Sequence, residues 1–266
     1  MKTPTNAFKQ SLLAGDRQYG LWLGLAQTIS TEICAGAGFD WLLIDAEHGP
    51  NDLRSILAQL QVIAAYASHP VVRPPHGDHV LIKQLLETGV QTLMIPMVES
   101  AAQAEQLVRA MRYPPQGIRG VGSALARASR WGRIGHYMHE ANDQMCLIVQ
   151  VETQAGLENL DAIQRVDGVD GIFFGAADLA ASLGFLGAAD HPDVVRLIED
   201  GLRRVSAAGT WGGVLCGDKA LVRRYEAAGA RFVAVGVDSM ILSGATSALC
   251  AEYRPADGAV DAAASY

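Results

Sequence analysis

Short apolar runs alternate with segments of helical periodicity along most of the chain, and the alternation occurs eight times. The runs are apolar on both faces, which is typical of strands in a parallel sheet covered by helices. Several of the intervening amphipathic segments end in Gly, as helix C-termini commonly do. Eight such units predict an α/β fold, a (β/α)8 TIM barrel, with a doubly wound open sheet as the alternative. The predicted strands are YGLWLGL, FDWLLID, HPVVRP, QTLMIPM, MCLIVQVE, DGIFFG, WGGVLC and RFVAVGV.

Two segments do not fit the repeat. The link over residues 113–144 is long for a barrel connection, so it is either a functional loop or an extra layer. The small and polar segment RPADGAVDAAASY ends the sequence and is expected to be loosely ordered. We therefore expect one TIM-barrel domain over residues 1–253 and a flexible tail over residues 254–266.

Charge and cysteine content exclude several classes of partner and compartment. The net charge is −7 and no basic block exists, so nucleic acid is not an expected partner. The apolar runs are of strand length and frequently broken, so no membrane span is expected. Four widely spaced cysteines form no CxxC pair, and no signal peptide is visible, which is typical of thiols in a reducing cytoplasm.

Polar side chains gather where the predicted strands end. In a TIM barrel the carboxyl ends of all strands form one rim, and chemistry occurs there. We expect the residues at these ends to converge on one site: Trp22, Asp45, Glu47, His48, Arg73, Gln150, Glu152 and Asp178.

Each of these residues also has a structural explanation. Asp45 and Asp178 are of a type that caps helices, and Arg73 suits a structural ion pair. Gln150 and Glu152 lie two positions apart and face the same side of their strand, where two inward polar groups are costly unless satisfied. The convergence of all of them on one rim favours a functional site.

The residue types at the rim indicate the chemistry. Two carboxylates with open positions suit a hard divalent cation such as Mg²⁺ or Mn²⁺. His48 follows Asp45 by three residues and is a candidate base whose tautomer the acid fixes. Arg73 carries a permanent charge that can hold an oxyanion. The amides that lead into Asp178 can bind a carboxylate at a helix N-terminus.

Lysine positions separate two aldolase mechanisms. A Schiff-base aldolase needs a lysine that points into the barrel. None of the four lysines lies within a predicted strand, and Lys219, just past the seventh strand, is only a weak candidate. Metal activation of a keto acid is therefore favoured over an imine.

Five stretches, in this order, resemble a known family over nearly the whole chain, from about Phe8 to Tyr253. They are GLWLGL, DWLLIDAEHGPN, RYPPQGIRGVGSALARASRWGRI, NDQMCLIVQVET and FVAVGVD. The chain is similar to the HpcH/HpaI aldolases, the metal-dependent (class II) pyruvate aldolases. The resemblance implies a cytoplasmic lyase of aromatic catabolism that assembles as a homo-hexamer.

The resemblance also implies residue roles. Glu152 and Asp178 would hold a divalent cation, Mg²⁺, Mn²⁺ or Co²⁺. Arg73 would stabilise the enolate oxygen, and His48, oriented by Asp45, would handle the proton of the C4 hydroxyl. Glu87, where relatives have Asp, would reach in from a neighbouring subunit. The residues that would contact substrate are Trp22, Gln150, Ala177, Asp178 and Leu215.

The implied reaction is reversible retro-aldol cleavage of a 4-hydroxy-2-oxo acid to pyruvate and an aldehyde. The expected substrate is 4-hydroxy-2-oxoheptanedioate, which gives succinic semialdehyde, and the alternative is a 2-keto-3-deoxy-sugar acid. Ala46 and Ala176 stand where relatives have Gly and Pro, and we expect them to shift the aldehyde scope rather than the reaction type.

Two hypotheses outside the aldolases assign another function to the same rim residues. A phosphoenolpyruvate mutase-type transferase would need phosphate donors beyond Arg73. A non-catalytic keto-acid binder would give no reason for His48 beside Asp45.

Overall fold

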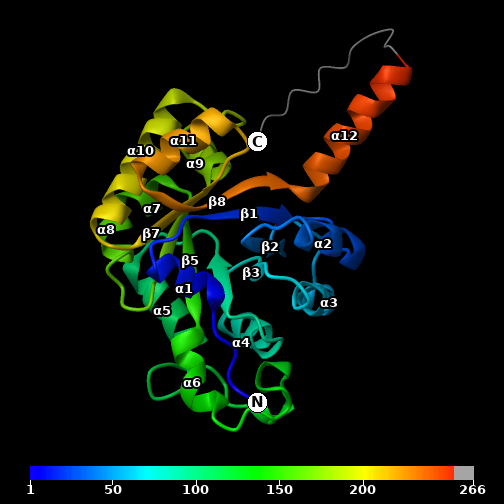
Figure 1. Ribbon diagram of the computed structural model, residues 1–266. Coiled ribbons are helices and arrows are strands. Elements are labelled where there is room, and N and C mark those ends of the chain that lie inside the picture. Colours follow the sequence, from blue (N-terminus) through cyan, green and yellow to red (C-terminus); the bar gives the residue numbers. More distant parts are fainter. Residues whose placement is uncertain (255–266) are drawn as a thin grey trace.

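The structure, a computed structural model, describes residues 1–254 and is a closed barrel of eight parallel strands in chain order (Figure 1). All eight predicted strands are present, so the prediction of a (β/α)8 barrel is confirmed. The strands are β1 (Gln18–Leu23), β2 (Trp41–Asp45), β3 (His69–Arg73), β4 (Thr92–Ile95), β5 (Cys146–Val151), β6 (Gly171–Phe174), β7 (Trp211–Leu215) and β8 (Ala230–Val237).

Helices follow the strands and cover the outside of the barrel (Figure 1). Several begin at a side-chain cap: Asp52, for example, accepts hydrogen bonds from the first-turn amides of Arg54 and Ser55. The helices are α1 (Ala7–Leu13), α2 (Thr28–Ala35), α3 (Leu53–Ile63), α4 (His79–Glu87), α5 (Ala101–Met111), α6 (Tyr137–Gln144), α7 (Gln154–Glu158), α8 (Leu160–Ile163), α9 (Ala176–Ser182), α10 (Pro192–Ala207), α11 (Lys219–Ala228) and α12 (Asp238–Tyr253).

The inside of the barrel is filled by large aromatic side chains. Trp41 and Phe232 are fully buried there with ring centroids 6.1 Å apart. Gly20 and Gly213 make room for them, because a Cβ at either position would stand 2.2 or 2.3 Å from an atom of Trp41 or Phe232. Phe8 of α1 packs edge-on against both rings and closes the amino-terminal end of the barrel. The barrel is therefore a packed core, with its one accessible rim at the carboxyl ends of the strands.

The long link over residues 113–144 is an extra layer with its own small core. It contains two 3-10 turns, Ser123–Leu125 and Arg127–Ser129, followed by α6. Arg119, 1 % exposed, lies between the rings of Tyr113 and Tyr137, with its Cζ 4.3 and 5.8 Å from the ring centroids. This cation–π arrangement stabilises the core of the link, and Arg119 joins the link to α4 through Oε1 of Glu87 at 3.1 Å.

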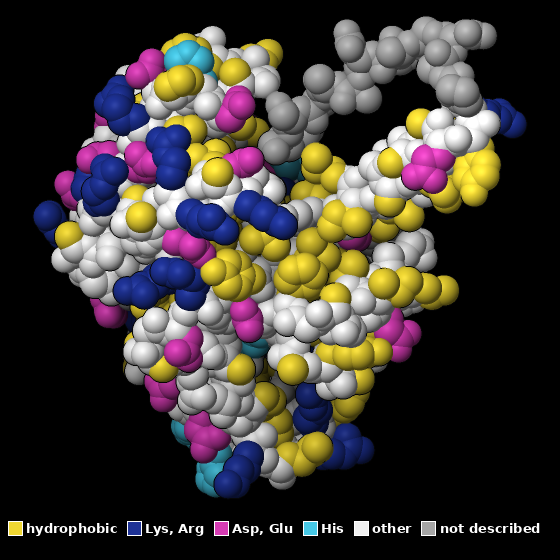
Figure 2. Space-filling model, turned by 45° about the horizontal axis from the view of Figure 1, so that its top comes forward, with side chains coloured by type: hydrophobic (Ala, Val, Ile, Leu, Met, Phe, Trp, Pro, Cys, Tyr) yellow, Lys and Arg dark blue, Asp and Glu magenta, His cyan; other side chains and the backbone are white. Residues whose placement is uncertain are grey.

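The last helix, α12, does not cover its own barrel. It extends away from β8, and all residues from 240 to 254 are exposed (Figure 1). They include large apolar side chains: Met240, Ile241, Leu242, Leu249 and Tyr253. Figure 2 shows hydrophobic side chains along α12 and on the barrel surface beside its base.

Every helix described over residues 1–254 is either too short or too polar to span a membrane. The predicted flexible tail lies outside the described residues, apart from Arg254.

Candidate active site

Arg73 and Asp45 form the centre of the rim. They end the neighbouring strands β3 and β2, where they stand opposite each other in the register. Arg73 donates from Nε to Asp45 Oδ1 at 2.9 Å and from Nη2 to Oδ2 at 2.7 Å. Burial alone would raise the pKa of Asp45, but the hydrogen bonds and charge of Arg73 outweigh it and hold the pKa below its usual value. This is a bidentate, charge-assisted pair.

Glu47 shares the same guanidinium. Its Oε2 lies 2.8 Å from Arg73 Nη1, although the angle is poor for a hydrogen bond. Burial raises the pKa of Glu47, the positive charge of Arg73 lowers it, and Asp45 and Asp178 raise it again, with a net increase. Burial therefore outweighs the nearby guanidinium at this carboxyl group.

A second chain of contacts runs from Arg73 through Gln150 to Glu152. Arg73 Nη1 donates to Gln150 Oε1 at 3.4 Å, and Gln150 Nε2 donates to Glu152 Oε2 at 3.0 Å. The other oxygen of Glu152 accepts the backbone N–H of Met97 at 2.7 Å. Burial above all, and then the charges of Glu47 and Asp178, raise the pKa of Glu152 to about 7.

Gly175 brings Glu152 to the start of α9. A Cβ at Gly175 would stand 2.2 Å from Oε2 of Glu152, so only glycine leaves space for this carboxylate. Asp178 lies in the first turn of α9, exposed, and its charge acts on both Glu47 and Glu152. Ala177 is exposed beside it. The sequence prediction that these residues meet at one rim agrees with the structure.

The predicted orientation of His48 by Asp45 is wrong in the structure. Asp45 accepts the backbone N–H of His48 at 3.4 Å, but its carboxylate is occupied by Arg73. The imidazole is 67 % exposed, and its Nε2 lies 3.9 Å from Oε2 of Glu47. The acid next to the His48 ring is therefore Glu47. The three-residue spacing of Asp45 and His48 gave no sign of this, because a turn lies between them.

Two apolar residues predicted to touch substrate border the same end of the barrel. Trp22 is 4 % exposed, donates from Nε1 to Asp45 Oδ2 at 3.3 Å, and lies 5.1 Å from the Arg73 guanidinium carbon. Leu215 ends β7, is partly buried, and packs against the aromatic cluster inside the barrel. Both thus border the polar cluster with apolar surface.

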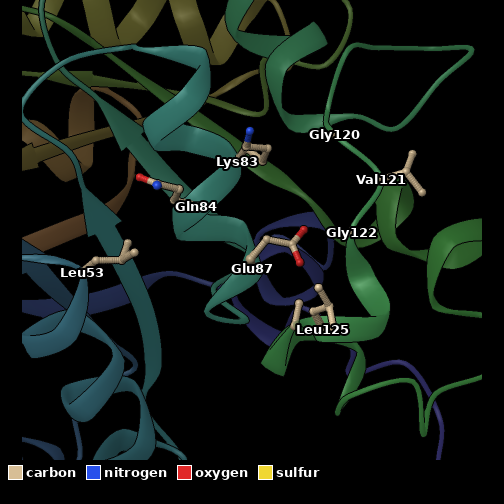
Figure 3. A pocket seen from close by; sticks show the side chains of 9 residues that line it. Leu53, Lys83, Gln84, Glu87, Gly120, Val121, Gly122 and Leu125 are labelled. Carbon is tan, nitrogen blue, oxygen red and sulfur yellow. The ribbon is translucent and has the colours of Figure 1, made fainter.

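Glu87 lies apart from this cluster, at the end of α4 on the outside of the barrel. Its Oε1 accepts from Arg119 Nη2 of the same chain at 3.1 Å. Its side chain lines a hollow of about 450 Å³ between α4 and the long link, together with Lys83 and Gln84 (Figure 3). The structure therefore does not bring Glu87 to the rim of its own barrel.

Two residues of the rim were not identified from the sequence. Met97 carries the backbone N–H that Glu152 accepts, and a backbone donor has no sequence signature. Asp238, 6 % exposed at the end of β8, accepts the backbone N–H groups of Gly24 at 2.8 Å and Leu25 at 3.3 Å. Asp238 directly follows an apolar strand, as Asp45 ends one, so the sequence pattern that identified Asp45 also pointed to Asp238.

The donor set fits a divalent cation. Four carboxyl groups of the rim, those of Asp45, Glu47, Glu152 and Asp178, accompany one guanidinium, which leaves an excess of three negative charges if all four are ionised. Within residues 1–254 no group of three His, Cys, Asp or Glu side chains is placed to hold a metal by itself. Two protein ligands, with the remainder from substrate and water, are what the residues offer.

Comparisons with known proteins identify the family of the chain. The HpcH/HpaI aldolase/citrate lyase family matches residues 18–245. A hydroxypyruvate/pyruvate aldolase of Deinococcus radiodurans is 62 % identical over 94 % of this chain and 90 % of its own. A 4-hydroxy-2-oxo-heptane-1,7-dioate aldolase of Salmonella heidelberg is 56 % identical over 93 % of this chain and 94 % of its own.

A solved structure of the same family has the same fold. A HpcH/HpaI aldolase/citrate lyase family protein from Burkholderia cenocepacia superimposes with a TM-score of 0.90 at 42 % identity, over 94 % of this chain and all of that one. The family match covers most of the chain, and the named relatives share more than half of its residues. The chain belongs to the HpcH/HpaI aldolase/citrate lyase family and is an aldolase.

Proposed function

We propose that this aldolase cleaves 4-hydroxy-2-oxo acids to pyruvate and an aldehyde, with 4-hydroxy-2-oxoheptanedioate as substrate and succinic semialdehyde as the aldehyde. The main support for the proposal is the arrangement around Arg73. Its guanidinium contacts Asp45 and Glu47 and is linked through Gln150 to Glu152. A fixed positive charge beside a carboxylate pair suits a keto acid that must become an enolate. The Salmonella relative, named for this dicarboxylate, supports the choice of substrate.

Glu152 and Asp178 would hold the divalent cation, Mg²⁺, Mn²⁺ or Co²⁺. When bound, the cation would supply Lewis-acid polarisation of the 2-keto oxygen. Gln150 and the Met97 N–H fix the two oxygens of Glu152 beforehand. Asp178 lies at the same rim in the first turn of α9, so the two carboxylates would come from two separate segments of the chain.

Arg73 would stabilise the enolate. A guanidinium has five N–H donors. The hydrogen bonds to Asp45 and Gln150 use Nε, one position on Nη2 and one on Nη1. The contact with Glu47 is an ion pair to Nη1, so Nη2 keeps one N–H donor for a substrate oxygen. Because the guanidinium is buried and clamped, it needs no reorganisation as negative charge develops on the keto oxygen. Trp22, Leu215 and Ala177 would border the bound acid.

His48 would accept the proton of the C4 hydroxyl as the C3–C4 bond breaks. Its ring is exposed at the rim, where a substrate can reach it. Glu47, 3.9 Å away, would stabilise the imidazolium that results. Asp45 would act through Arg73, as the group that fixes the guanidinium.

A second donor, hydroxypyruvate, is favoured by one observation. The Deinococcus relative, which shares 62 % of its aligned residues with this chain, is named for both hydroxypyruvate and pyruvate. We therefore propose that the enzyme also accepts hydroxypyruvate in the synthetic direction. The 2-keto-3-deoxy-sugar-acid alternative is not favoured by the named relatives.

The α12 helix supports a homo-oligomer, and we propose the hexamer. A helix of 16 residues whose last 14 side chains are solvent-exposed gains almost no stability from its own barrel. The same barrel exposes Ile29 (74 %) and Ile33 (71 %) on α2. A second copy would cover both surfaces reciprocally, which is the simplest closed arrangement. Light scattering should give the mass of a hexamer, and Ile241→Asp should lower it. A monomeric wild type would refute the assembly.

We place the enzyme in the cytoplasm and treat residues 1–253 as one domain. All four cysteines are free thiols, which supports a reducing compartment: Cys34, Cys146, Cys216 and Cys250.

The proposed reaction is tested by pyruvate release from a panel of 4-hydroxy-2-oxo acids and 2-keto-3-deoxy-sugar acids. We expect the highest kcat/KM for the dicarboxylate. Activity should disappear on exhaustive chelation and return with Mg²⁺, Mn²⁺ or Co²⁺. Higher kcat/KM for a sugar acid would replace the proposed substrate.

Borohydride supplies an independent test of the metal mechanism. Treatment with pyruvate and borohydride should leave the protein mass unchanged, because the proposed reaction forms no imine. A reduced adduct on any lysine, detected by mass spectrometry, would contradict it.

A further inference from the structure

Met97 has a backbone conformation that a methionine rarely adopts. It follows β4 and Pro96, and its φ of +57° is in the left-handed region. That region costs a non-glycine residue roughly 1–2 kcal/mol. No helix begins here, since α5 starts at Ala101 with Ser100 as its cap. Strain of this kind persists only where the surroundings enforce it, and it is concentrated at functional sites.

Both backbone groups of Met97 are occupied. Its N–H donates to Glu152 Oε1 at 2.7 Å, and its carbonyl accepts from Gln103 Nε2 at 3.2 Å. Gln103, on α5, also accepts the N–H of Glu99 at 3.0 Å through its Oε1. The neighbouring Val98 N–H donates to the carbonyl of Gln150. The side chain of Gln103 therefore holds the loop between β4 and α5 at two points.

The left-handed φ determines where the Met97 N–H points. With the carbonyl fixed by Gln103, a return of φ to the ordinary negative region rotates the N–H about the N–Cα bond and away from Glu152. Glu152 would then keep only the Gln150 hydrogen bond on its other oxygen. With both bonds in place, its two oxygens are fixed by donors from two separate segments of the rim.

We propose that Gln103 and the backbone of Met97 are positioning residues for Glu152: Gln103 enforces the left-handed turn, and the turn aims the Met97 N–H at the carboxylate that would hold the cation. This rests on the proposed function, because it assigns Glu152 to metal binding. Groups that orient a metal ligand in this way typically change metal affinity 10–100-fold when they are lost.

The test is Mn²⁺ binding by the full-length protein, followed by the electron paramagnetic resonance signal of free Mn²⁺. Gln103→Met removes both side-chain hydrogen bonds at nearly constant size, and it should weaken Mn²⁺ binding by about 10–100-fold. Gln106→Met, on the same helix at an exposed position, is the matched control. Its Mn²⁺ affinity should lie within about twofold of that of the wild type, because exposed substitutions away from a site usually have small effects.

Met97→Ala separates the backbone of Met97 from its side chain. It keeps the N–H and the demand for a left-handed φ, so its Mn²⁺ affinity should fall much less than that of Gln103→Met. Thermal unfolding midpoints and circular dichroism of all variants exclude misfolding as the cause of any loss.

Three results would overturn the inference: equal Mn²⁺ affinity of Gln103→Met and the Gln106→Met control, a loss in Met97→Ala as large as that in Gln103→Met, or a loss that follows unfolding alone. Failure of the wild type to bind Mn²⁺ is a different result, since it would refute the metal site itself. Aldolase activity is not needed to distinguish these outcomes.

Discussion

Arg73 holds both carboxylate oxygens of Asp45, through Nε at 2.9 Å and Nη2 at 2.7 Å, across the register of two neighbouring strands. Both residues are at most 6 % exposed. Because both partners are buried, water does not compete for these hydrogen bonds. Asp45 therefore holds the Arg73 guanidinium at the rim in one orientation. The predictions below start from this pair.

Asp45→Asn should lower both stability and catalysis. The asparagine fits the space but leaves Arg73 with a weaker partner in a buried setting. Loss of one member of a buried pair typically destabilises by 3–5 kcal/mol, and we expect about 3 kcal/mol because Glu47 remains. Urea unfolding measures it. Asp167→Asn removes a pairing with Arg112 in which the acid is 97 % exposed, and should change stability by less than about 1 kcal/mol. Equal effects would contradict the role of Asp45.

His48→Ala and Arg73→Ala should differ between two reactions. Oxaloacetate also gives pyruvate enolate on losing CO₂, but it has no C4 hydroxyl to deprotonate. His48→Ala should slow aldol cleavage by about 10²–10⁴-fold and leave metal-dependent oxaloacetate decarboxylation largely intact. Arg73→Ala should slow both by about 10²–10³-fold, because both develop enolate charge.

Mn²⁺ affinity must be unchanged in the two variants for this comparison to hold. The His48 ring is 67 % exposed, so its removal should not affect folding. If His48→Ala slows the two reactions equally, His48 is not the hydroxyl base, and Glu47 becomes the better candidate.

Gly175→Ala should displace Glu152. The added Cβ would stand 2.2 Å from a carboxylate oxygen, which is far inside van der Waals contact. We expect Mn²⁺ affinity and aldol cleavage to fall at least about tenfold, as for other changes around a metal ligand. Gly135→Ala is the control, since its Cβ would meet no atom within 4 Å. Wild-type Mn²⁺ affinity in Gly175→Ala would show that Glu152 does not depend on this space.

His69 should make the fold sensitive to acid. Burial lowers its pKa from 6.5 to about 4. The unfolded chain therefore binds the proton first, so stability is complete above about pH 6.5 and falls as the pH decreases toward 4. The difference between the two pKa values corresponds to a maximum loss of about 3 kcal/mol in the free energy of unfolding.

Urea unfolding of wild type and His69→Gln between pH 7 and 4 measures this contribution. Glutamine can still bond to the Thr92 hydroxyl, which lies 3.0 Å from His69 Nε2, but it does not titrate. The variant should lose less stability over this range than wild type. His79→Gln, at a side chain that is 68 % exposed, should follow the wild-type curve. Parallel curves for His69→Gln and wild type would exclude the effect.

Glu87 provides a test of a shared active site. It lies outside its own barrel, so any catalytic role requires a second copy. Glu87→Ala and Arg73→Ala should each be nearly inactive, and mixing them under subunit exchange should restore part of the activity. Mixed assemblies without activity, with exchange proven by native mass spectrometry, would assign Glu87 to the Arg119 contact alone.

The barrel could be predicted because its signal repeats. Each strand is apolar on both faces, and eight repeats of this pattern leave few alternatives. The behaviour of α12 was not predictable in the same way. Its sequence is as apolar as that of a packed helix, and only three-dimensional placement shows that its own barrel leaves it uncovered.

The site residues could be found at the strand ends, but their partners could not. Sequence spacing put Asp45 with His48, whereas the structure pairs Asp45 with Arg73, 28 residues away. Long-range pairs of this kind depend on strand register, which the spacing of residues along one strand does not contain. The Met97 N–H donor could not be predicted for a different reason, because its direction depends on the φ angle of Met97 and not on a side chain.

Asp238 has a consequence for the order of events during synthesis. It joins the end of β8 to Gly24 and Leu25, more than 200 residues earlier, beside the pairing of β8 with β1. β8 must therefore leave the ribosome before the barrel can close. Until then β1 presents an unpaired edge to other nascent chains. For this protein, the strand that covers the edge of β1 is the last of the eight to emerge.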